Sequence, residues 1–94
     1  MIGLLTLHLH LDGCKSLKEK RSQIKPLMAN LQRKFNLSVC EAGLHDNWNE
    51  TLIACAMVGN EDAHLQRSLA TVLRWVEANW PDGQVFDQQV EMIR

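Results

Sequence analysis

Apolar and polar side chains alternate along the start of the sequence. Between residues 2 and 11, one set of alternate positions is uniformly apolar, namely Leu5, Leu7, Leu9 and Leu11. The other set comprises Leu4, Thr6, His8 and His10. This period of two predicts a β-strand with one face on a hydrophobic core. Asp12 and Gly13 then predict the turn that ends the strand.

A helical period follows in residues 15–35. Ser16 and Glu19 have the spacing of a capping box, in which a hydroxyl and a carboxylate satisfy amides at the start of a helix. The apolar side chains form one stripe, made of Leu17, Ile24, Leu27, Met28, Leu31 and Phe35. The opposite face carries Lys18, Arg21, Ser22, Lys25, Gln32 and Arg33. Pro26 lies on the solvent side and is expected to bend this helix without dividing it, and Asn36 is expected to close it.

Residues 37–44 and 51–58 predict two strands joined by the polar turn of residues 45–50. If this hairpin is centred between Asn47 and Trp48, Cys40 lies opposite Cys55. The core face would then hold Cys40, Ala42, Ile53, Cys55 and Met57, and the other face Val39, Glu41, Ala54 and Ala56. We therefore expect Cys40 and Cys55 to be buried, reduced thiols. A shift of one residue would exchange the two faces.

The last third of the chain predicts a helix and a strand. Asn60 is the expected helix cap, with Glu61 and Asp62 in its first turn. The buried stripe of this helix is Leu65, Leu69, Val72, Leu73, Val76 and Trp80, and Trp75 lies at its margin. A turn at residues 80–83 stops the helix. In residues 85–93, Phe86, Val90 and Met92 alternate with Asp87, Gln89 and Glu91.

The order of these elements is β-α-β-β-α-β, without a long loop. This order predicts one α+β domain over residues 1–94, a ferredoxin-like plait whose four-stranded antiparallel sheet carries both helices on one face. The other face of the sheet is left uncovered. Its central strands offer Thr6, His8, His10, Ala54 and Ala56 but no stacking aromatic side chain. We therefore expect this face to serve as an interface in a homo-oligomer rather than as a platform for RNA bases.

Composition limits the classes of protein to which this chain can belong. The apolar fraction of 46% and the charged fraction of 22% are those of an ordinary soluble globular protein. Cys14, Cys40 and Cys55 have no C-x-x-C spacing, which argues against a disulfide framework or a zinc site. The chain has no membrane-spanning run and no signal-peptide pattern at its start, so we expect a cytoplasmic protein that does not contact a membrane.

Charge is strongly segregated along the chain. Residues 15–35 hold seven of the ten Lys and Arg residues but only one acid, whereas the rest of the chain has three bases against ten acids. The candidate phosphate- or partner-binding residues are Lys15, Lys18, Lys20, Arg21 and Lys25. Such a surface could neutralise several phosphates, although the overall pI of about 6.4 is low for a nucleic-acid-binding domain. It could equally dock on an acidic surface of another protein or of a second copy.

Three short phrases resemble a known family. Ser16-Leu17-Lys18-Glu19-Lys20-Arg21, Lys34-Phe35-Asn36 and Asp46-Asn47-Trp48 are similar to segments of the YlxP family, also called DUF503. The resemblance spans essentially the whole chain and implies a ferredoxin-like fold. Genes of this family often lie among those for transcription, translation initiation and ribosome maturation, so the resemblance also implies work related to RNA.

Two further features admit alternative interpretations. Trp48 lies in a polar turn, where we expect it to fold back over a sheet edge, although it could instead be an interface anchor. His8 and His10 could hold a transition metal together with a neighbouring carboxylate, but no motif supplies the third ligand. The sequence contains no P-loop, no Ser-His-Asp arrangement and no cofactor motif.

Together these observations predict a non-enzymatic cytoplasmic binding module without a cofactor or metal. It is expected to associate with RNA or ribosomal particles through the basic first helix. The first alternative is a homo-oligomeric protein–protein interaction module that uses the open sheet face. The second is a small metal-dependent enzyme at the face that carries His8 and His10.

Overall fold

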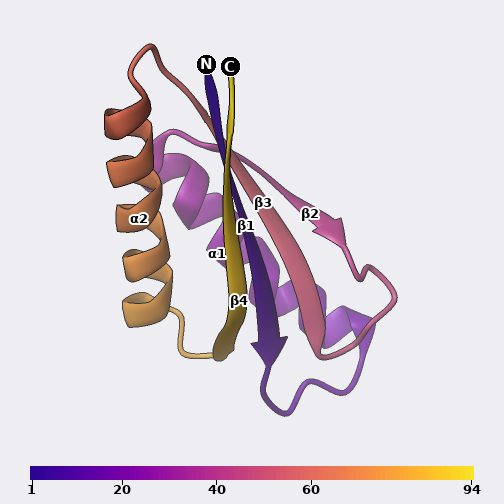
Figure 1. Cartoon of the computed structure of the whole chain (residues 1–94). Helices are drawn as coiled ribbons and strands as arrows, with labels where there is room; N and C mark the ends of the chain where they lie inside the picture. The colour runs from indigo at the N-terminus through magenta and orange to yellow at the C-terminus, as the bar shows by residue number, and fades with distance from the viewer.

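Four strands and two helices follow one another in the predicted order (Figure 1). The computed structural model describes residues 1–94. The elements are β1 (Ile2–Leu11), α1 (Leu17–Phe35), β2 (Ser38–Gly43), β3 (Glu50–Val58), α2 (Asp62–Asn79) and β4 (Gly83–Ile93). All neighbouring strands are antiparallel, in the order β2-β3-β1-β4. This arrangement is the ferredoxin-like plait that the sequence predicts.

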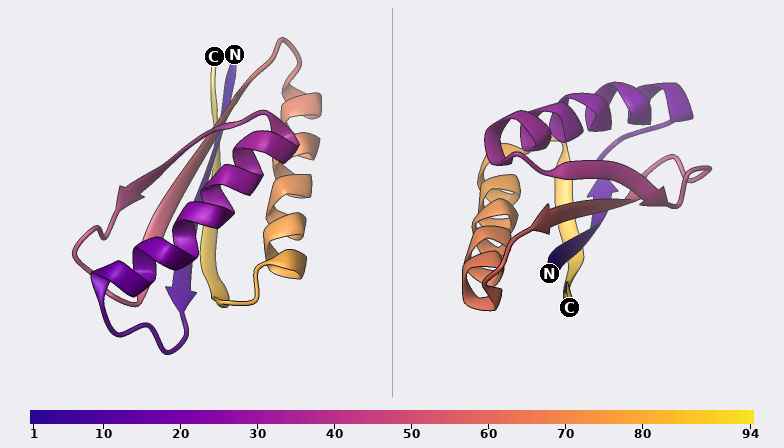
Figure 2. Two further views of the ribbon diagram at one scale, coloured as in Figure 1. Left: turned by 180° about the vertical axis from the view of Figure 1, so that it is seen from behind. Right: turned by 90° about the horizontal axis from the view of Figure 1, so that it is seen from above.

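Both helices lie on the same side of the twisted sheet (Figure 2). Helix α2 packs on β1 and β4, and α1 packs on β2. The opposite side of the sheet, which we call the open face, carries no helix (Figure 1). The ends of β1 and β4 lie side by side, since Ile2 pairs with Ile93. Neither helix is long and apolar enough to cross a membrane.

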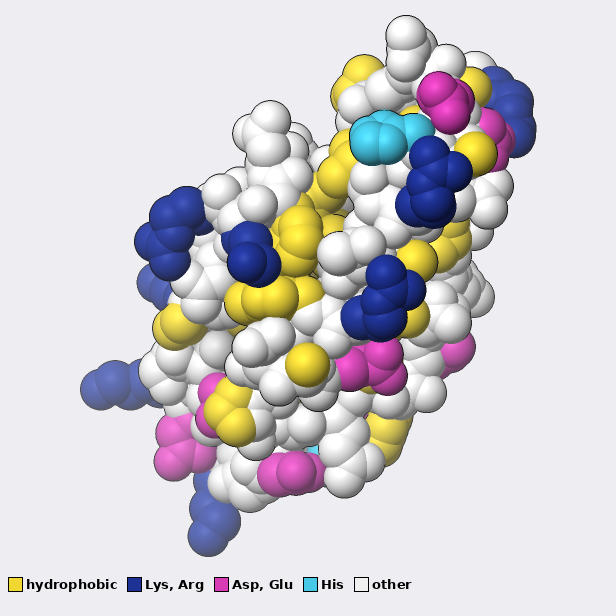
Figure 3. All heavy atoms as spheres, turned by 90° about the vertical axis from the view of Figure 1, so that its left-hand side faces the viewer, with side chains coloured by type: hydrophobic (Ala, Val, Ile, Leu, Met, Phe, Trp, Pro, Cys, Tyr) yellow, Lys and Arg dark blue, Asp and Glu magenta, His cyan; other side chains and the backbone are white.

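The core lies between the sheet and the helices. The predicted leucines of β1 are all fully buried, as are Ile53 and Cys55 of β3. The helices contribute Ile24, Leu27, Leu31, Leu65, Leu69, Val72 and Val76. At its margin, the rings of Phe35 and Trp75 meet edge to face with their centroids 5.9 Å apart. Figure 3 shows apolar side chains that remain visible on the left-hand side of the molecule as drawn in Figure 1. The predicted core stripes and the partial burial of Trp75 are confirmed.

Helix α1 has defined ends. The hydroxyl of Ser16 accepts a hydrogen bond from the Glu19 amide at 3.1 Å, and the Glu19 carboxylate accepts one from the Lys15 amide at 2.7 Å. The first bond is that of the predicted capping box, whereas the carboxylate accepts from the residue before the N-cap and not from Ser16 itself. Asn36 ends the helix with left-handed dihedral angles, φ 54° and ψ 47°. The helix runs without interruption through Pro26. In α2, by contrast, the predicted cap at Asn60 is wrong, because Glu61 occupies the N-cap position.

The predicted register of the β2–β3 hairpin is wrong by one residue. Val39, not Cys40, lies opposite Cys55, and Cys40 lies opposite Ala54. Cys40 is therefore exposed on the open face, while Cys55 is fully buried. The register shifts between Glu41 and Gly43, where the strand has an irregularity. The predicted register requires a symmetrical turn, and one unpaired residue between Glu41 and Gly43 is enough to exchange the faces of β2.

A second irregularity changes the position of Phe86. The register between β1 and β4 shifts so that His8 pairs with Asp87 and Leu9 pairs with Val85. Phe86 was predicted to alternate with Asp87, but it lies on the open face with the two histidines. Its ring is stacked on His10 with centroids 5.0 Å apart and meets His8 edge to face at 5.6 Å. The open face therefore has an aromatic side chain, although it comes from an edge strand.

Candidate functional site

A basic surface covers the solvent side of α1. Lys15, Lys18, Arg21 and Lys25 are all exposed, as predicted. We call these four residues the basic face. None of their charged nitrogen atoms lies within 4.0 Å of a carboxylate oxygen. The ion pairs of the structure all involve other residues. Their charges are therefore free to interact with a partner.

Lys20 does not belong to this surface, and its prediction as a binding residue is wrong. It is only 1% exposed. Its ammonium group donates to the carbonyl oxygens of Leu44 at 2.6 Å and Asn47 at 2.8 Å, and lies 2.8 Å from the Glu41 carboxylate. The helical period of α1 could have predicted that Lys20 is buried. Lys20 lies one turn before Ile24, on the buried stripe of the helix.

Glu41 and Thr51 complete a buried polar group under α1. The hydroxyl of Thr51, which is fully buried, donates to the Glu41 carboxylate at 2.8 Å. Burial by itself would raise the pKa of Glu41 above its ordinary value. The hydrogen bonds from Lys20 and Thr51, with the charges of Lys20 and His45, outweigh burial and hold that pKa below its ordinary value. We call Lys20, Glu41 and Thr51 the Lys20 cluster.

The loop of residues 44–49, here called the hairpin loop, is tied down at several points. The Asn47 amide donates to the Leu44 carbonyl at 3.0 Å, and the Asn47 side-chain oxygen accepts from the Asn49 amide at 3.1 Å. The Leu11 amide donates to the Asn49 carbonyl at 2.7 Å. With the two bonds from Lys20, these contacts join the hairpin loop to both α1 and the end of β1.

Trp48 projects from the hairpin loop into solvent. Its side chain is 56% exposed, so the prediction that it covers a sheet edge is wrong. It borders an open hollow of about 360 Å³, here called the Trp48 hollow. The other residues that line this hollow are Cys14, Asp46, Asn47 and Asn49. Trp48 is therefore accessible to a partner, as its alternative interpretation as an interface anchor requires.

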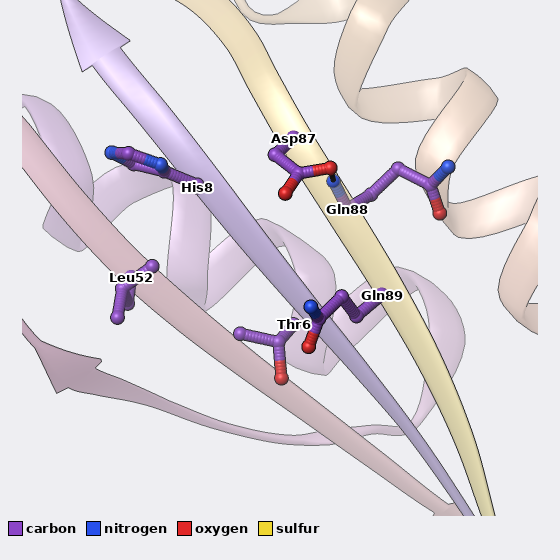
Figure 4. Close-up of a pocket in the computed structure, with 6 residues that line it drawn as sticks. All are labelled: Thr6, His8, Leu52, Asp87, Gln88 and Gln89. Atoms are coloured by element: carbon purple, nitrogen blue, oxygen red, sulfur yellow. Dashed lines mark hydrogen bonds between the residues drawn. The ribbon is translucent and has the colours of Figure 1, made fainter.

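The half of the open face that carries His8 and His10 is polar. His8 lies 2.8 Å from the Glu50 carboxylate, and Asp87 is its partner on β4. A hollow of about 240 Å³ lies here, lined by Thr6, His8, Leu52, Asp87, Gln88 and Gln89. Figure 4 shows Thr6 and Gln89 approaching each other from β1 and β4. No group of three or more His, Cys, Asp or Glu side chains is arranged to hold a metal ion. The metal-dependent alternative therefore lacks a third ligand.

The other half of the open face is mostly apolar. Ile2 pairs with both Val58 and Ile93, and these side chains are 38%, 79% and 44% exposed. In the next row across the sheet, Leu4 and Ala56 lie between Ser38 and Glu91, and Cys40 and Ala54 follow them. The predicted placement of Thr6, Ala54 and Ala56 on the open face is confirmed by this register. The charged strand residues of this face are all acids, Glu50, Asp87 and Glu91.

Comparison with known proteins decides the family. A family model described as "Protein of unknown function (DUF503)" matches residues 2–90. The chain belongs to the DUF503 family. It is 32% identical over 78 residues to the uncharacterized protein YlxP of Bacillus subtilis (strain 168), an alignment that covers 83% of this chain and 85% of that relative. The resemblance inferred from the sequence is confirmed.

Two of the phrases that carry the DUF503 resemblance meet in space. Lys20, from the phrase at residues 16–21, donates to the carbonyl of Asn47, from the phrase at residues 46–48. Within the first phrase, Ser16 and Glu19 cap the helix, whereas Lys18 and Arg21 point to solvent. Ser16, Glu19 and Lys20 therefore stabilise the fold, whereas the exposed cations Lys18 and Arg21 are available to a partner.

Proposed function

We propose that this protein is a non-enzymatic binding module that associates with RNA or a ribonucleoprotein through the basic face of α1. The observation that carries the proposal is a row of exposed cations without carboxylate partners. Lys18, Arg21 and Lys25 follow one another along a single helix face. Over seven residues the helix rises about 10 Å, a length that spans two to three phosphates of a strand.

The distribution of charge supports an approach of nucleic acid from the α1 side. The net charge of −1 conceals two different surfaces, because the open face carries acids and no Lys or Arg on its strands. Helix α1 and the open face lie on opposite sides of the sheet (Figures 1 and 2). A polyanion is attracted to the first and repelled by the second. A near-neutral pI is therefore compatible with phosphate binding at one face.

Reversal of three charges tests the proposal. The variant Lys18→Glu, Arg21→Glu, Lys25→Glu should fold normally, since exposed charges contribute little to stability. Its matched control is Lys34→Glu, Arg67→Glu, Arg74→Glu, which makes the same change in net charge at three other exposed positions. We expect the first variant to lose co-sedimentation with ribosomal particles and the control to keep most of it. The double variant His8→Ala, His10→Ala should co-sediment like the wild type.

Salt dependence provides a second measurement. Each phosphate contact contributes about 0.7 to the slope of log affinity against log salt for single strands and about 0.9 for duplexes. Loss of two or three contacts should therefore lower the slope by about 2. If the charge-reversed protein folds and still co-sediments at low salt like the wild type, the basic face is only a solvated surface and the proposal fails.

A second candidate function, homo-oligomerisation through the open face, is favoured by the exposed row of Ile2, Val58 and Ile93. An apolar sheet face without a covering helix is suited to pack against a second copy. Val58→Glu should then shift the sedimentation coefficient towards that of a monomer. Ala63→Glu, on the exposed side of α2, is the control. A wild-type protein that sediments as a 10.7 kDa monomer at micromolar concentration would exclude this candidate.

A further inference from the structure

The Trp48 hollow lies next to the basic face but is a separate feature. The hairpin loop runs beside the first turns of α1 in each view (Figures 1 and 2). The two bonds from Lys20 to the loop carbonyls fix this contact. Cys14 also lines the hollow, and Lys15 follows it in the chain. The hollow therefore borders the segment that leads into the basic face.

The exposure of Trp48 is built into the fold. An indole has one of the largest apolar surfaces among side chains, and it is normally covered. Here more than half of it faces solvent, with 56% exposed. The loop that carries it is held at both ends, by Lys20 and by the bond from Leu11 to Asn49. Because the backbone of the loop is already held, a ligand that covers the indole orders little of the chain, which favours binding.

The polar groups of the hollow suit the edge of a flat heterocycle. The side chain of Asn47 is occupied, because it accepts from the Asn49 amide and donates to Glu50. The exposed carboxamide of Asn49 makes no hydrogen bond within the protein, and it offers both donors and an acceptor. The exposed carboxylate of Asp46 is also unpaired and offers acceptors alone. Ring N–H groups, amino groups and carbonyls on a nucleobase complement this set.

We propose that the Trp48 hollow takes one unpaired base of an RNA strand. The base stacks on the indole of Trp48, and its edge hydrogen-bonds with Asn49 and Asp46. The phosphates on either side of that base then lie towards Lys15 and Lys18. This inference rests on the function proposed above and specifies its ligand as single-stranded RNA, because a base within a duplex is already stacked and cannot enter the hollow.

Tryptophan fluorescence tests the stacking directly. Trp48 is exposed, whereas Trp75 is partly buried and Trp80 is 8% exposed, so a ligand in solution reaches Trp48 first. We expect a single-stranded RNA decamer to quench the fluorescence on binding. The same sequence in a duplex and inorganic polyphosphate should bind to the basic face without this quenching. Quenching of equal size by polyphosphate would overturn the inference.

Substitution separates the base site from the basic face. Trp48→Ala should fold normally and bind the decamer about tenfold more weakly, the effect expected for one stacked base. Trp48→Phe should restore most of the affinity, because a phenyl ring also stacks. Trp75→Phe is the control and should match the wild type. The salt slope should stay the same in all three variants, since the phosphate contacts remain.

The outcomes distinguish this inference from the proposed function. If Lys18→Glu, Arg21→Glu, Lys25→Glu abolishes RNA binding while Trp48→Ala binds like the wild type, the proposed function stands and the base site is wrong. If Trp48→Ala binds RNA normally but no longer co-sediments with ribosomal particles, the hollow docks a protein and the inference is also wrong. If the wild type binds no RNA at low salt, the inference fails, and if it also does not co-sediment with ribosomal particles, the proposed function fails with it.

Discussion

The ammonium group of Lys20 and the carboxylate of Glu41 meet at 2.8 Å beneath α1, with their side chains only 1% and 17% exposed. A buried ion pair is tolerated when further hydrogen bonds satisfy both partners. Two loop carbonyls satisfy Lys20, and Thr51 satisfies Glu41. The pair and its hydrogen bonds therefore join α1 to β2 and to the hairpin loop, whose bonded carbonyls lie 24 and 27 residues after Lys20 in the sequence.

Removal of the buried cation should be costly. In Lys20→Met the Glu41 carboxylate loses its counter-ion and the Asn47 carbonyl loses its donor, whereas the Leu44 carbonyl keeps the bond from the Asn47 amide. We expect the free energy of unfolding to fall by about 3 kcal/mol, as when one partner of a buried pair is removed. Urea denaturation measures this change. Lys18→Met, at an exposed position of the same helix, is the matched control and should stay within about 0.5 kcal/mol of the wild type. Equal effects at both positions would contradict the role of Lys20.

The Lys20 cluster should also make stability depend on pH. The pKa of Glu41 is lower in the folded chain than in the unfolded chain, so the folded state is stabilised fully above the ordinary carboxyl pKa. That contribution is lost as the pH falls through the lowered pKa of the folded state, below about pH 4. Glu41→Gln should be less stable at neutral pH but should change less on acidification. Thermal denaturation between about pH 7 and pH 3 compares the two proteins. Parallel curves would show that Glu41 does not contribute.

The three cysteines should react with thiol reagents at very different rates. Cys40 is exposed on the open face, whereas Cys14 and Cys55 are buried. Burial, with a smaller effect of the neighbouring Cys40, raises the pKa of the Cys55 thiol to about 12. Since the thiolate is the reactive form, a chromogenic disulfide reagent at pH 8 should give one rapid equivalent in the native protein. Cys40→Ser should remove that phase. A rapid phase that survives this substitution would show that a buried thiol is accessible.

The order of the elements and the core stripes could be predicted because they depend on local periods. The alternating leucines of β1 and the stripe that includes Ile24, Leu27 and Leu31 each follow from a few neighbouring residues. The exposed cations of α1 follow from the same helical period. The family resemblance implies the same fold, and two of the phrases that carry it meet at the hydrogen bond between Lys20 and Asn47.

The errors concern features that depend on distant parts of the chain. The helical period places Lys20 on the buried stripe, but it does not show the carbonyls, 24 and 27 residues away, that accept from its ammonium group. The positions of Cys40 and Phe86 depend on irregularities in strand pairing, which no alternation reveals. Trp48 is exposed because hydrogen bonds from α1 and β1 hold its loop. A single sequence contains the residues of the Trp48 hollow, but it does not show that they meet.

The position of β1 in the middle of the sheet has a consequence for folding kinetics. Its partners are β3 and β4, so Ile2 must find both Val58 and Ile93 before the central strand is complete. Contacts between residues so distant in sequence require large loops to close, and folding rates fall as such contacts increase. We expect this domain to fold more slowly than a helical protein of equal length. In a chain whose β4 is not yet paired, one edge of β1 is open to strands of other molecules, and we expect aggregation to begin from this edge.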